Sequence, residues 1–236
     1  MADKTERKST ASHMREWIKS IVIALAIFLL LRTFLIEAFR IPSGSMENTL
    51  LVGDFLFVNK ALYGAEIPFT GVRLPPIREP ERGDLVIFRS VEDERLTVVK
   101  RIIGVPGDTL AMVDNVLQVS GVPRDEPYAL HVDSLADPED PKMRAWQVRY
   151  LTADRDPTEY RPTLKNWGPI VVPPDSFFVM GDNRDHSYDS RYWGFLGRRR
   201  IRGRPLIVYY SYDKNGVLPL PFITSVRWRR LFATPD

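Results

Sequence analysis

Hydrophobic residues are concentrated in one segment near the start of the chain. Residues 17–39 are mainly apolar, and the run from Ile21 to Leu31 contains no polar side chain. A helix that crosses a bilayer needs about 20 predominantly apolar residues, whereas a buried core helix normally keeps a polar stripe. The pattern therefore predicts a membrane-spanning helix over residues 17–39, after a polar tail at residues 1–16. No small-x-small cleavage site follows the apolar run, so the segment is expected to be an uncleaved anchor.

Beyond residue 40 the pattern changes to short strands. Apolar and β-branched runs bounded by Gly, Pro or Asp predict strands at residues 55–58, 85–88, 96–103, 116–119, 176–180 and 206–210. No later stretch has a long 3.6-residue period. Nineteen prolines and fourteen glycines also favour strands and turns over a helical bundle. The expected fold class is mostly β, preceded by one N-terminal transmembrane helix.

One part of this β region is loop-rich. Residues 124–166 are charged and carry prolines at positions 127, 138, 141, 157 and 162. This composition is typical of an excursion from a β core and not of a linker between independent domains. We therefore expect one domain over residues 40–236, with residues 109–173 as an inserted second subdomain.

The charges that flank the apolar segment predict its orientation. Residues 40–59 contain a single basic residue, Arg40. The first twenty residues contain five: Lys4, Arg7, Lys8, Arg15 and Lys19. The positive-inside rule places the N-terminus in the cytoplasm and the remaining chain outside. Arg32 is expected either inside the bilayer or at its outer edge.

Overall composition excludes several classes of protein. The formal net charge of +3 is small for 236 residues, and the basic residues are spread out, so no nucleic-acid partner is expected. The absence of cysteine excludes disulfides, a cysteine nucleophile and cysteine-bound metals.

The first cluster of residues that could take part in catalysis lies directly after the apolar segment. In the run Ile41-Pro42-Ser43-Gly44-Ser45-Met46, Pro42 and Gly44 predict a tight, exposed turn that presents Ser43 and Ser45. A lone Ser-Gly-Ser is more often an ordinary turn or helix cap than a nucleophile.

The second cluster is a lysine inside an apolar strand. Because strand side chains alternate, Lys100 shares its face with Val98 and Ile102, and desolvation there favours the neutral amine that a general base requires. A lysine at the strand edge that reaches water is the alternative. Arg101 points to the opposite face, where a carboxylate is the expected partner.

The third cluster is the polar run from Gly181 to Gly194, after the strand at 176–180. Asp189 and Arg191 are placed to brace the backbone, and Ser187 offers a hydroxyl that could orient a lysine amine. A plain hydrogen-bonded turn or an oxygen-ligated cation site are alternatives, although no EF-hand spacing is present.

A histidine-based site is less well supported. The three histidines, His13, His131 and His186, are scattered. They form no zinc-binding pattern such as HExxH, and proximity in sequence does not make a catalytic triad. Each is expected to be a surface histidine, and no metal or cofactor is expected.

Together the three clusters resemble the type I signal peptidase (leader peptidase) family. The matching segments occur in the family's order from about residue 17 to the end. They are the apolar span, Ile-Pro-Ser-Gly-Ser-Met, Arg82-Gly83-Asp84, Lys100-Arg101, Gly104-Val105-Pro106-Gly107-Asp108 and the run from Gly181 to Gly194. Any one of them is a weak signal, but the ordered set is specific.

The resemblance implies a β-barrel-like catalytic domain with a loop-rich β insertion, and a Ser–Lys dyad. Ser45 would be the nucleophile and Lys100 its general base. Supporting roles would fall to Ser43 (oxyanion hole, with the Ser45 N–H), Ser187 (orientation of the Lys100 amine), Asp189, Arg191, and Asp182 paired with Arg101. Apolar pockets for small residues would be formed by Ile41, Pro42, Met46, Leu50, Leu56, Ile87, Val98 and Val99.

The implied function is removal of signal peptides from exported preproteins after Ala-x-Ala-type sites. The implied location is the bacterial inner membrane, with the lipid bilayer as a partner and the catalytic domain on the periplasmic side. Two positions depart from the family: Asn48 stands where proline is usual, and His186 where asparagine is common. Alternatives are a self-cleaving repressor, a conjugation-type Ser–Lys processing peptidase, a signal-anchored envelope binding module and a catalytically dead relative.

Overall fold

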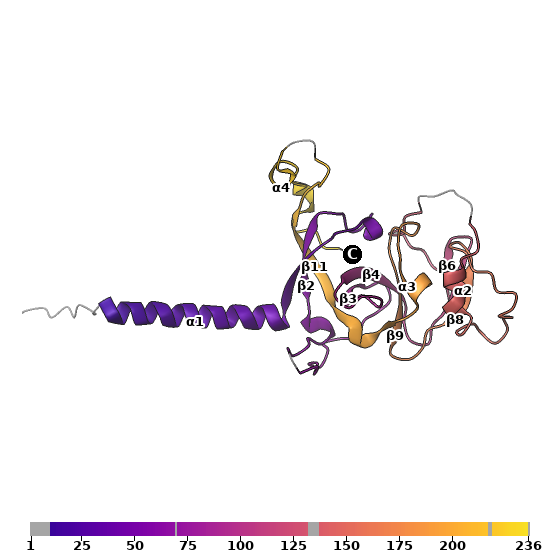
Figure 1. The fold of residues 1–236 in the computed structure, drawn as a ribbon, viewed down its shortest axis with the longest axis horizontal. Helices are drawn as coiled ribbons and strands as arrows, with labels where there is room; N and C mark the ends of the chain where they lie inside the picture. The colour runs from indigo at the N-terminus through magenta and orange to yellow at the C-terminus, as the bar shows by residue number, and fades with distance from the viewer. Residues whose placement is uncertain (1–9, 69, 132–136, 217–218, 236) are drawn as a thin grey trace, which may run out of the picture.

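A computed structural model describes residues 10–68, 70–131, 137–216 and 219–235. A long helix, α1 (Thr10–Phe34), leads into a domain that contains two β-sheets. Figure 1 shows α1 projecting from one side of the domain, while the smaller sheet lies at the end farthest from the helix. The chain is thus mostly β with one long N-terminal helix, as expected.

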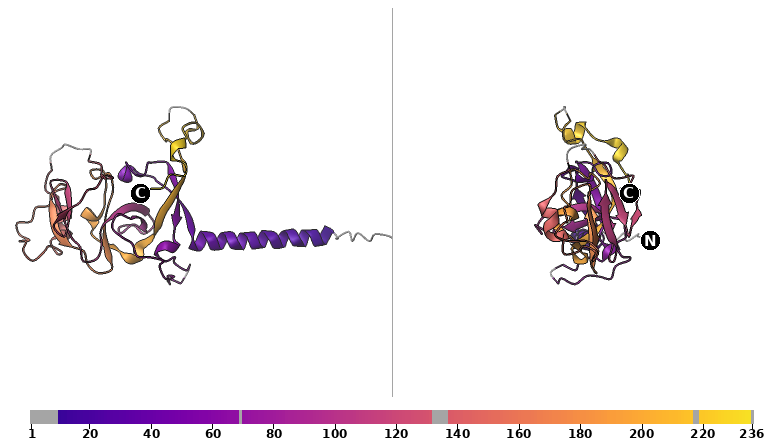
Figure 2. Two further views of the ribbon diagram at one scale, coloured as in Figure 1. Left: turned by 180° about the vertical axis from the view of Figure 1, so that it is seen from behind. Right: turned by 90° about the vertical axis from the view of Figure 1, so that its right-hand side faces the viewer.

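Helix α1 is the one described helix that is long and apolar enough to cross a membrane. Its 25 residues span about 37 Å, and its large apolar side chains from Trp17 to Leu31 are 44–71% exposed. The left view in Figure 2 shows it extending away from the domain. An apolar surface of this kind is stable only in contact with lipid or protein.

The expected boundaries of the span require correction. The helix begins at Thr10 and ends at Phe34, and β1 (Ile36–Arg40) starts after Leu35. Residues 36–39 are therefore strand and not helix. The reason is pairing: Ile36 lies opposite Asn59 and Arg40 opposite Phe55, so the backbone groups of this segment bond to a neighbouring strand.

The larger sheet has seven strands in the order β1-β2-β11-β3-β4-β9-β10. The other members are β2 (Asp54–Asn59), β3 (Leu85–Arg89), β4 (Thr97–Gly104), β9 (Ser176–Met180), β10 (Leu196–Gly197) and β11 (Ile201–Ser211). Register shifts interrupt the pairing of β11 with both β2 and β3. Such bulges bend and twist a strand, and the sheet curls into part of a barrel.

The smaller sheet lies within the predicted insertion at residues 109–173. It has the order β7-β6-β5-β8, with β5 (Thr109–Val113), β6 (Val116–Val119), β7 (Val122–Pro123) and β8 (Trp167–Val171). Between β7 and β8 the chain makes long loops and helix α2 (Pro141–Gln147). Asp140 caps α2, because its carboxylate accepts hydrogen bonds from the N–H groups of Lys142 and Met143.

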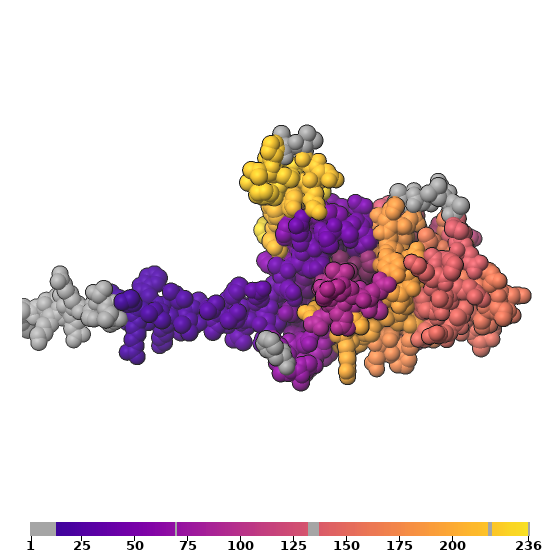
Figure 3. Space-filling view, viewed as in Figure 1, coloured from indigo at the N-terminus to yellow at the C-terminus, as the bar shows by residue number. Residues whose placement is uncertain are grey.

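Short elements complete the domain. They are η1 (Gly44–Met46), η2 (Ala61–Tyr63), α3 (Ser190–Trp193), η3 (Arg198–Arg200), α4 (Pro221–Thr224) and η4 (Trp228–Arg230). In Figure 3 the C-terminal segment that contains α4, in yellow, protrudes from the domain beside the indigo and purple N-terminal strands.

Three apolar clusters form the core. One lies on the face of the large sheet that carries Leu56, Ile87 and Val99. The second lies on the opposite face around Val86 and Ile102, and the third joins the small sheet to β4 and β9. Strand β4 contributes to all three, which explains why it is apolar on both faces. It is also the strand that carries the lysine singled out above.

Candidate active site

Ser45 lies in η1, a single 3-10 turn that follows β1. Backbone hydrogen bonds from Ile41 to Asp54 and from Gly53 to Ile41 fix the chain just before this turn. Those from Glu47 to Gly44 and from Leu50 to Met46 close the turn. Met46 and Leu50 are fully buried, so the turn is anchored by its apolar side chains while Ser45 stays partly accessible. The sequence forms a fixed turn here because Pro42 and Gly44 favour the turn, and the buried side chains of Ile41 and Met46 hold its two ends.

Lys100 reaches Ser45 from β4. Its Nζ donates a hydrogen bond of 2.5 Å to Ser45 Oγ, and the residue is 5% exposed. Burial lowers the pKa of Lys100 to about 8, although the negative charges of Asp189 and Asp182 act in the opposite direction. A neutral amine next to a serine hydroxyl is the arrangement needed to accept the hydroxyl proton.

The dyad opens onto a cleft of about 460 Å³. Ser43, Ser45 and Lys100 line it together with apolar side chains that include Val98 and Trp193. Ser43 is exposed, has extended backbone geometry and makes no capping bond to η1 with its side chain. The N–H of Ser45 belongs to the first turn of η1, where no preceding turn supplies a carbonyl partner. Both groups are therefore available to donate to an oxygen in the cleft.

The polar run after β9 packs directly against the Ser45 turn. The N–H of Asn183 donates to Ser45 O at 3.2 Å. Its side-chain Nδ2 donates to Gly44 O at 3.3 Å and to a carboxylate oxygen of Glu47 at 3.2 Å. Gly181 lies so close that an added Cβ would be 2.4 Å from Ser45 O. This run thus sets the position of the nucleophile backbone.

Asp189 and Arg191 form a buried ion pair inside the run. The Nε and Nη2 atoms of Arg191 each donate to the Asp189 carboxylate at 2.9 Å, and Gly181 N donates to it at 3.0 Å. Burial alone would raise the pKa of Asp189, but the charges of Arg191 and Lys100 keep it below its usual value. Asp189 also caps α3 through the N–H of Arg191. The pair fixes the loop backbone, as its two-residue spacing suggested.

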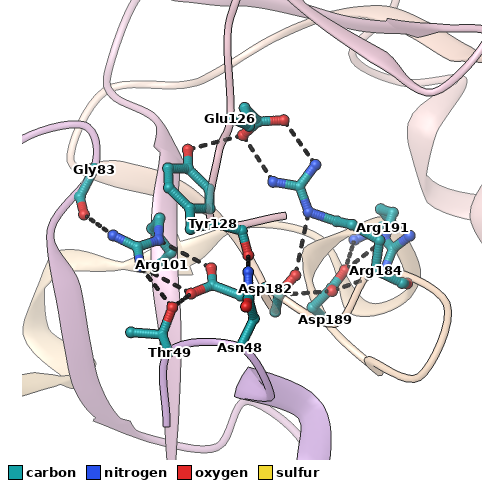
Figure 4. A network of polar contacts seen from close by, with 11 residues as sticks. Asn48, Thr49, Gly83, Arg101, Glu126, Tyr128, Asp182, Arg184, Asp189 and Arg191 are labelled. Carbon is teal, nitrogen blue, oxygen red and sulfur yellow. Dashed lines mark hydrogen bonds and ion pairs between the residues drawn. The ribbon is translucent and has the colours of Figure 1, made fainter. Parts of the chain in front are cut away.

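Arg101 and Asp182 form a second buried pair on the opposite face of β4. Two hydrogen bonds of 2.9 and 2.8 Å join them, and both residues are at most 3% exposed. Thr49 donates to Asp182 at 2.5 Å, and the Tyr128 ring lies 3.9 Å from the Arg101 guanidinium carbon. Figure 4 shows these contacts around Asp182. They connect the chain just after the Ser45 turn to β4 and to the insertion.

A third buried pair was not found by sequence reasoning. Glu126, from the insertion, accepts two hydrogen bonds of 2.7 Å from Arg184, which is 1% exposed. Tyr128 OH donates to the same carboxylate at 2.9 Å (Figure 4). Arg191 in turn donates to Arg184 O at 2.6 Å. No local pattern marks Glu126, because its partner is far away in sequence and its neighbours are also charged.

Ser187 lies beside the dyad but makes no hydrogen bond to Lys100. The residue is 5% exposed, and among the described residues its Oγ has no hydrogen-bond partner of normal geometry. It is nevertheless close enough to Asp189 to help lower the pKa of that carboxyl. Its expected role of orienting the Lys100 amine stays a prediction.

The apolar residues expected to form substrate pockets are mostly inaccessible. Six of them are at most 6% exposed and belong to one core cluster: Ile41, Met46, Leu50, Leu56, Ile87 and Val99. Pro42 is exposed and Val98 is half-buried in the cleft wall. None of these six residues lines the cleft; their apolar layer includes Met46 of the Ser45 turn and Val99, which lies on the face of β4 opposite Lys100. His186 is exposed and also lines the cleft, whereas His13 and His131 are exposed elsewhere.

Comparisons with known proteins agree on one family. The family described as "Signal peptidase, peptidase S26" matches residues 14–210. Signal peptidase I of Pseudomonas aeruginosa is 34% identical over 229 residues, which cover 89% of this chain and 78% of that protein. Signal peptidase I P of Bacillus subtilis subsp. natto is 36% identical over 215 residues, covering 91% of this chain and 97% of that protein.

A solved structure is also similar. The crystal structure of a signal peptidase I from Enterococcus faecalis V583 has 30% sequence identity and a TM-score of 0.37, covering 54% of this chain and 97% of that chain. The family match spans the apolar helix, the Ser45 turn, β4 and the polar run after β9. This chain therefore belongs to the peptidase S26 family of signal peptidases.

Proposed function

We propose that this chain is a membrane-bound serine endopeptidase that removes N-terminal signal peptides from exported preproteins after Ala-x-Ala-type sites. The observation that carries the proposal is the 2.5 Å hydrogen bond between Lys100 Nζ and Ser45 Oγ in a member of this family. With a pKa of about 8, roughly a tenth of Lys100 is neutral at pH 7, against less than about one part in a thousand for a free lysine.

Acylation follows from this geometry. Ser45 Oγ attacks the scissile carbonyl as its proton passes to the neutral amine of Lys100. The negative charge on the carbonyl oxygen is stabilised by the Ser43 hydroxyl and the Ser45 N–H, which both face the cleft. The ammonium of Lys100 then gives its proton to the departing amine, and this releases the mature protein and leaves the signal peptide as an ester on Ser45.

Deacylation uses the same groups. Lys100, neutral again, removes a proton from a water molecule that attacks the ester carbonyl. The protonated lysine returns a proton to Ser45 Oγ, and the signal peptide leaves as a carboxylic acid. Asp189 and Arg191 support Lys100 indirectly by fixing the loop that packs on Ser45, and Asp182 and Arg101 do so from the other face of β4. Ser187 is assigned to orient the amine during these proton transfers.

The apolar layer next to the Ser45 turn supports a preference for small side chains. Its six residues are packed together and at most 6% exposed: Ile41, Met46, Leu50, Leu56, Ile87 and Val99. Pro42 and Val98 border the accessible surface. A side chain of alanine size needs little more room than this surface offers, whereas a large side chain would have to displace buried atoms.

We place the N-terminus in the cytoplasm and the catalytic domain on the outer side of a bacterial inner membrane. The flanking charges support this orientation. The chain has no cysteine, so single-cysteine variants offer a direct test. In spheroplasts an impermeant maleimide should label Lys142→Cys, which is exposed on the catalytic domain, and should leave Lys8→Cys unlabelled until the membrane is disrupted. The reverse pattern contradicts the orientation.

The activity is tested with the full chain in detergent micelles and a preprotein whose signal peptide ends in Ala-x-Ala. Wild type should cut after the second alanine, as located by mass spectrometry. Ser45→Ala and Lys100→Met should abolish the cut while both variants keep the wild-type circular dichroism spectrum. A folded wild type that cuts nothing would favour the envelope binding module. Activity in Lys100→Met would show that another group is the base, with His186 the first to examine.

A further inference from the structure

A hollow separate from the cleft at Ser45 lies at the point where α1 enters the domain. Its volume is about 780 Å³, and it shares no lining residue with the cleft at Ser45. Figure 1 shows this junction between α1 and the strands that follow it. One wall is apolar and comes from α1, through Phe28, Leu29 and Leu31. The basic wall comes mainly from the domain, through Lys60, Arg73, Arg89 and Arg202, and Arg32 at the end of α1 adds to it.

The basic wall carries more charge than its acidic neighbours neutralise. Five basic side chains line the hollow, Arg32, Lys60, Arg73, Arg89 and Arg202, with two acidic ones, Glu37 and Glu66. The ion pairs among them are long, 3.6 Å for Lys60–Glu37 and 3.8 Å for Arg89–Glu66. A smaller adjoining hollow adds Arg199, Arg200 and Glu94. A concave surface with this excess of positive charge attracts anions.

Two of these arginines also have buried donor atoms without an acceptor in the part of the chain that the structure describes. One Nη of Arg73 donates to Ile201 O at 2.5 Å. Its other Nη and the Nε of Arg202 are buried without a hydrogen-bond partner among the described residues. Burial lowers the pKa of Arg73, and the attraction of Glu66 does not offset burial and the neighbouring arginines together. Buried donors of this kind are normally satisfied, so an oxygen-rich anion fits the site.

The position of the hollow indicates where this anion comes from. The apolar run of α1 ends at Leu31, and Arg32 is the first charged residue after it. If α1 spans the bilayer, the hollow lies at the depth of the lipid phosphates, with Phe28 and Leu31 still in the hydrocarbon region. A molecule that has both a phosphate and an acyl chain matches both walls.

We propose that this hollow binds an anionic phospholipid of the surrounding bilayer. The headgroup phosphate lies among Arg73, Arg89 and Arg202, since the guanidinium fork suits phosphate oxygens, and an acyl chain follows Phe28 and Leu31 along α1. The inference rests on the membrane anchoring proposed above. Bound lipid would fix the angle between α1 and the domain, because it contacts both.

The test is native mass spectrometry of the full chain released from micelles that contain equal amounts of phosphatidylglycerol and phosphatidylcholine. Wild type should retain phosphatidylglycerol preferentially. Arg89→Gln/Arg202→Gln should weaken that preference roughly 25-fold, at about fivefold for each basic residue near an anionic surface. Arg124→Gln/Arg149→Gln removes the same charge from exposed positions outside the hollow and should leave the preference unchanged. Arg89→Lys/Arg202→Lys should recover most of it. Inorganic phosphate alone should not displace the lipid.

Each outcome has a defined meaning. Equal loss in the two glutamine pairs would overturn the inference, because it would reflect net charge alone. Displacement by inorganic phosphate would overturn the lipid as the source of the anion. Absence of any preference in a wild type that still cuts the preprotein would refute the lipid site and leave the proposed function intact. If the wild type keeps the preference for phosphatidylglycerol but cuts nothing, the result would support the lipid site and refute the proposed function.

Discussion

The carboxylate of Glu126 accepts hydrogen bonds at 2.7 Å from both Nη atoms of Arg184, which lies 58 residues further along the chain. Arg184 holds the polar run after β9 through Gly181 O at 3.2 Å and accepts from Arg191 at its own carbonyl. The insertion therefore braces the loop that packs on Ser45, although it contributes no residue to the dyad.

Replacing Glu126 tests this bracing. Glu126→Gln leaves the buried Arg184 charge without its carboxylate, so the free energy of unfolding should fall by about 3 kcal/mol. Cleavage activity should also fall, because the backbone around Gly181 loses support. Glu139→Gln, which removes an exposed partner of Arg161, is the matched control and should change stability by less than about 1 kcal/mol. Urea unfolding of the two variants decides the matter, and equal effects would contradict the bracing role.

Gly181 should tolerate no side chain. A Cβ there would lie 2.3 Å from Ser187 Oγ and 2.4 Å from Ser45 O, and the second is a backbone atom that cannot rotate away. Gly181→Ala should therefore displace the Ser45 turn and reduce kcat at least about a hundredfold, since small misplacements of a nucleophile are costly. Gly197→Ala meets nothing within 4 Å and should keep wild-type activity in the same preprotein assay. Full activity in Gly181→Ala would refute the proposed packing.

The departure from the family at Asn48 has a structural explanation. Asn48 has φ of 89°, and its Nδ2 donates to Tyr128 O at 3.1 Å. Proline, with φ fixed near −65°, does not fit this backbone. Asn48→Pro should therefore destabilise the chain, although the family resemblance led us to expect proline at this position.

Asn48→Gly separates the two contributions of that residue. Glycine keeps the positive φ at little cost but loses the hydrogen bond to Tyr128. We expect thermal denaturation to rank the variants wild type, Asn48→Gly, Asn48→Pro, in order of decreasing stability. A proline variant as stable as wild type would show that the turn adopts another conformation.

The rate should rise with pH through about 8. Below this pH most of Lys100 is protonated and cannot accept a proton, so kcat/KM should increase about tenfold per pH unit and then level off. The profile is measured with a preprotein or peptide that carries no group titrating between pH 6 and 9. A profile that is flat across this range would exclude Lys100 as the base.

The same buried amine should lower stability. The folded chain holds the pKa of Lys100 near 8, below the 10.5 expected when it is unfolded, so the unfolded state binds more protons between these values. Stability contributed by this group therefore rises with pH from about 8 to about 10.5. Lys100→Met should be inactive and yet more stable than wild type by about 3 kcal/mol at pH 7. The difference should shrink over that pH window, as urea titrations at several pH values would show.

Local sequence patterns predicted the helix, several strands and the face of β4 on which Lys100 lies. The spacing of apolar residues along the chain predicted the apolar helix and the six expected strands. It also predicted that Lys100 lies on an apolar strand face. Arg101 pairs with a carboxylate on the opposite face, as alternation required. The end of the span was placed five residues too far along, because β1 is also apolar and helix and strand share that composition.

The sequence did not predict the contacts between residues that lie far apart along the chain. Glu126 and Tyr128 reach Arg184 and Arg101 because the insertion folds back along the chain that follows β9, where Leu130 pairs with Asn183. Nor does composition reveal that five basic residues from separate elements meet beside the end of α1. Contacts of this kind depend on tertiary packing, which a single sequence does not encode in any local pattern.

Only Leu35 separates α1 from β1, and Lys60 ties this joint by donating from its backbone to Leu35 O and from Nζ to Arg32 O. The eleven residues from Leu35 to Ser45 can extend at most about 40 Å, and the pairing of β1 with β2 removes most of that freedom. If α1 spans the bilayer, as proposed above, Ser45 is therefore held at a set height above the lipid. A peptide bond would be cut only when its own membrane segment presents it at that height, so distance from the bilayer selects the cleavage site together with side-chain size. Lengthening the joint with inserted residues would move that site along the preprotein.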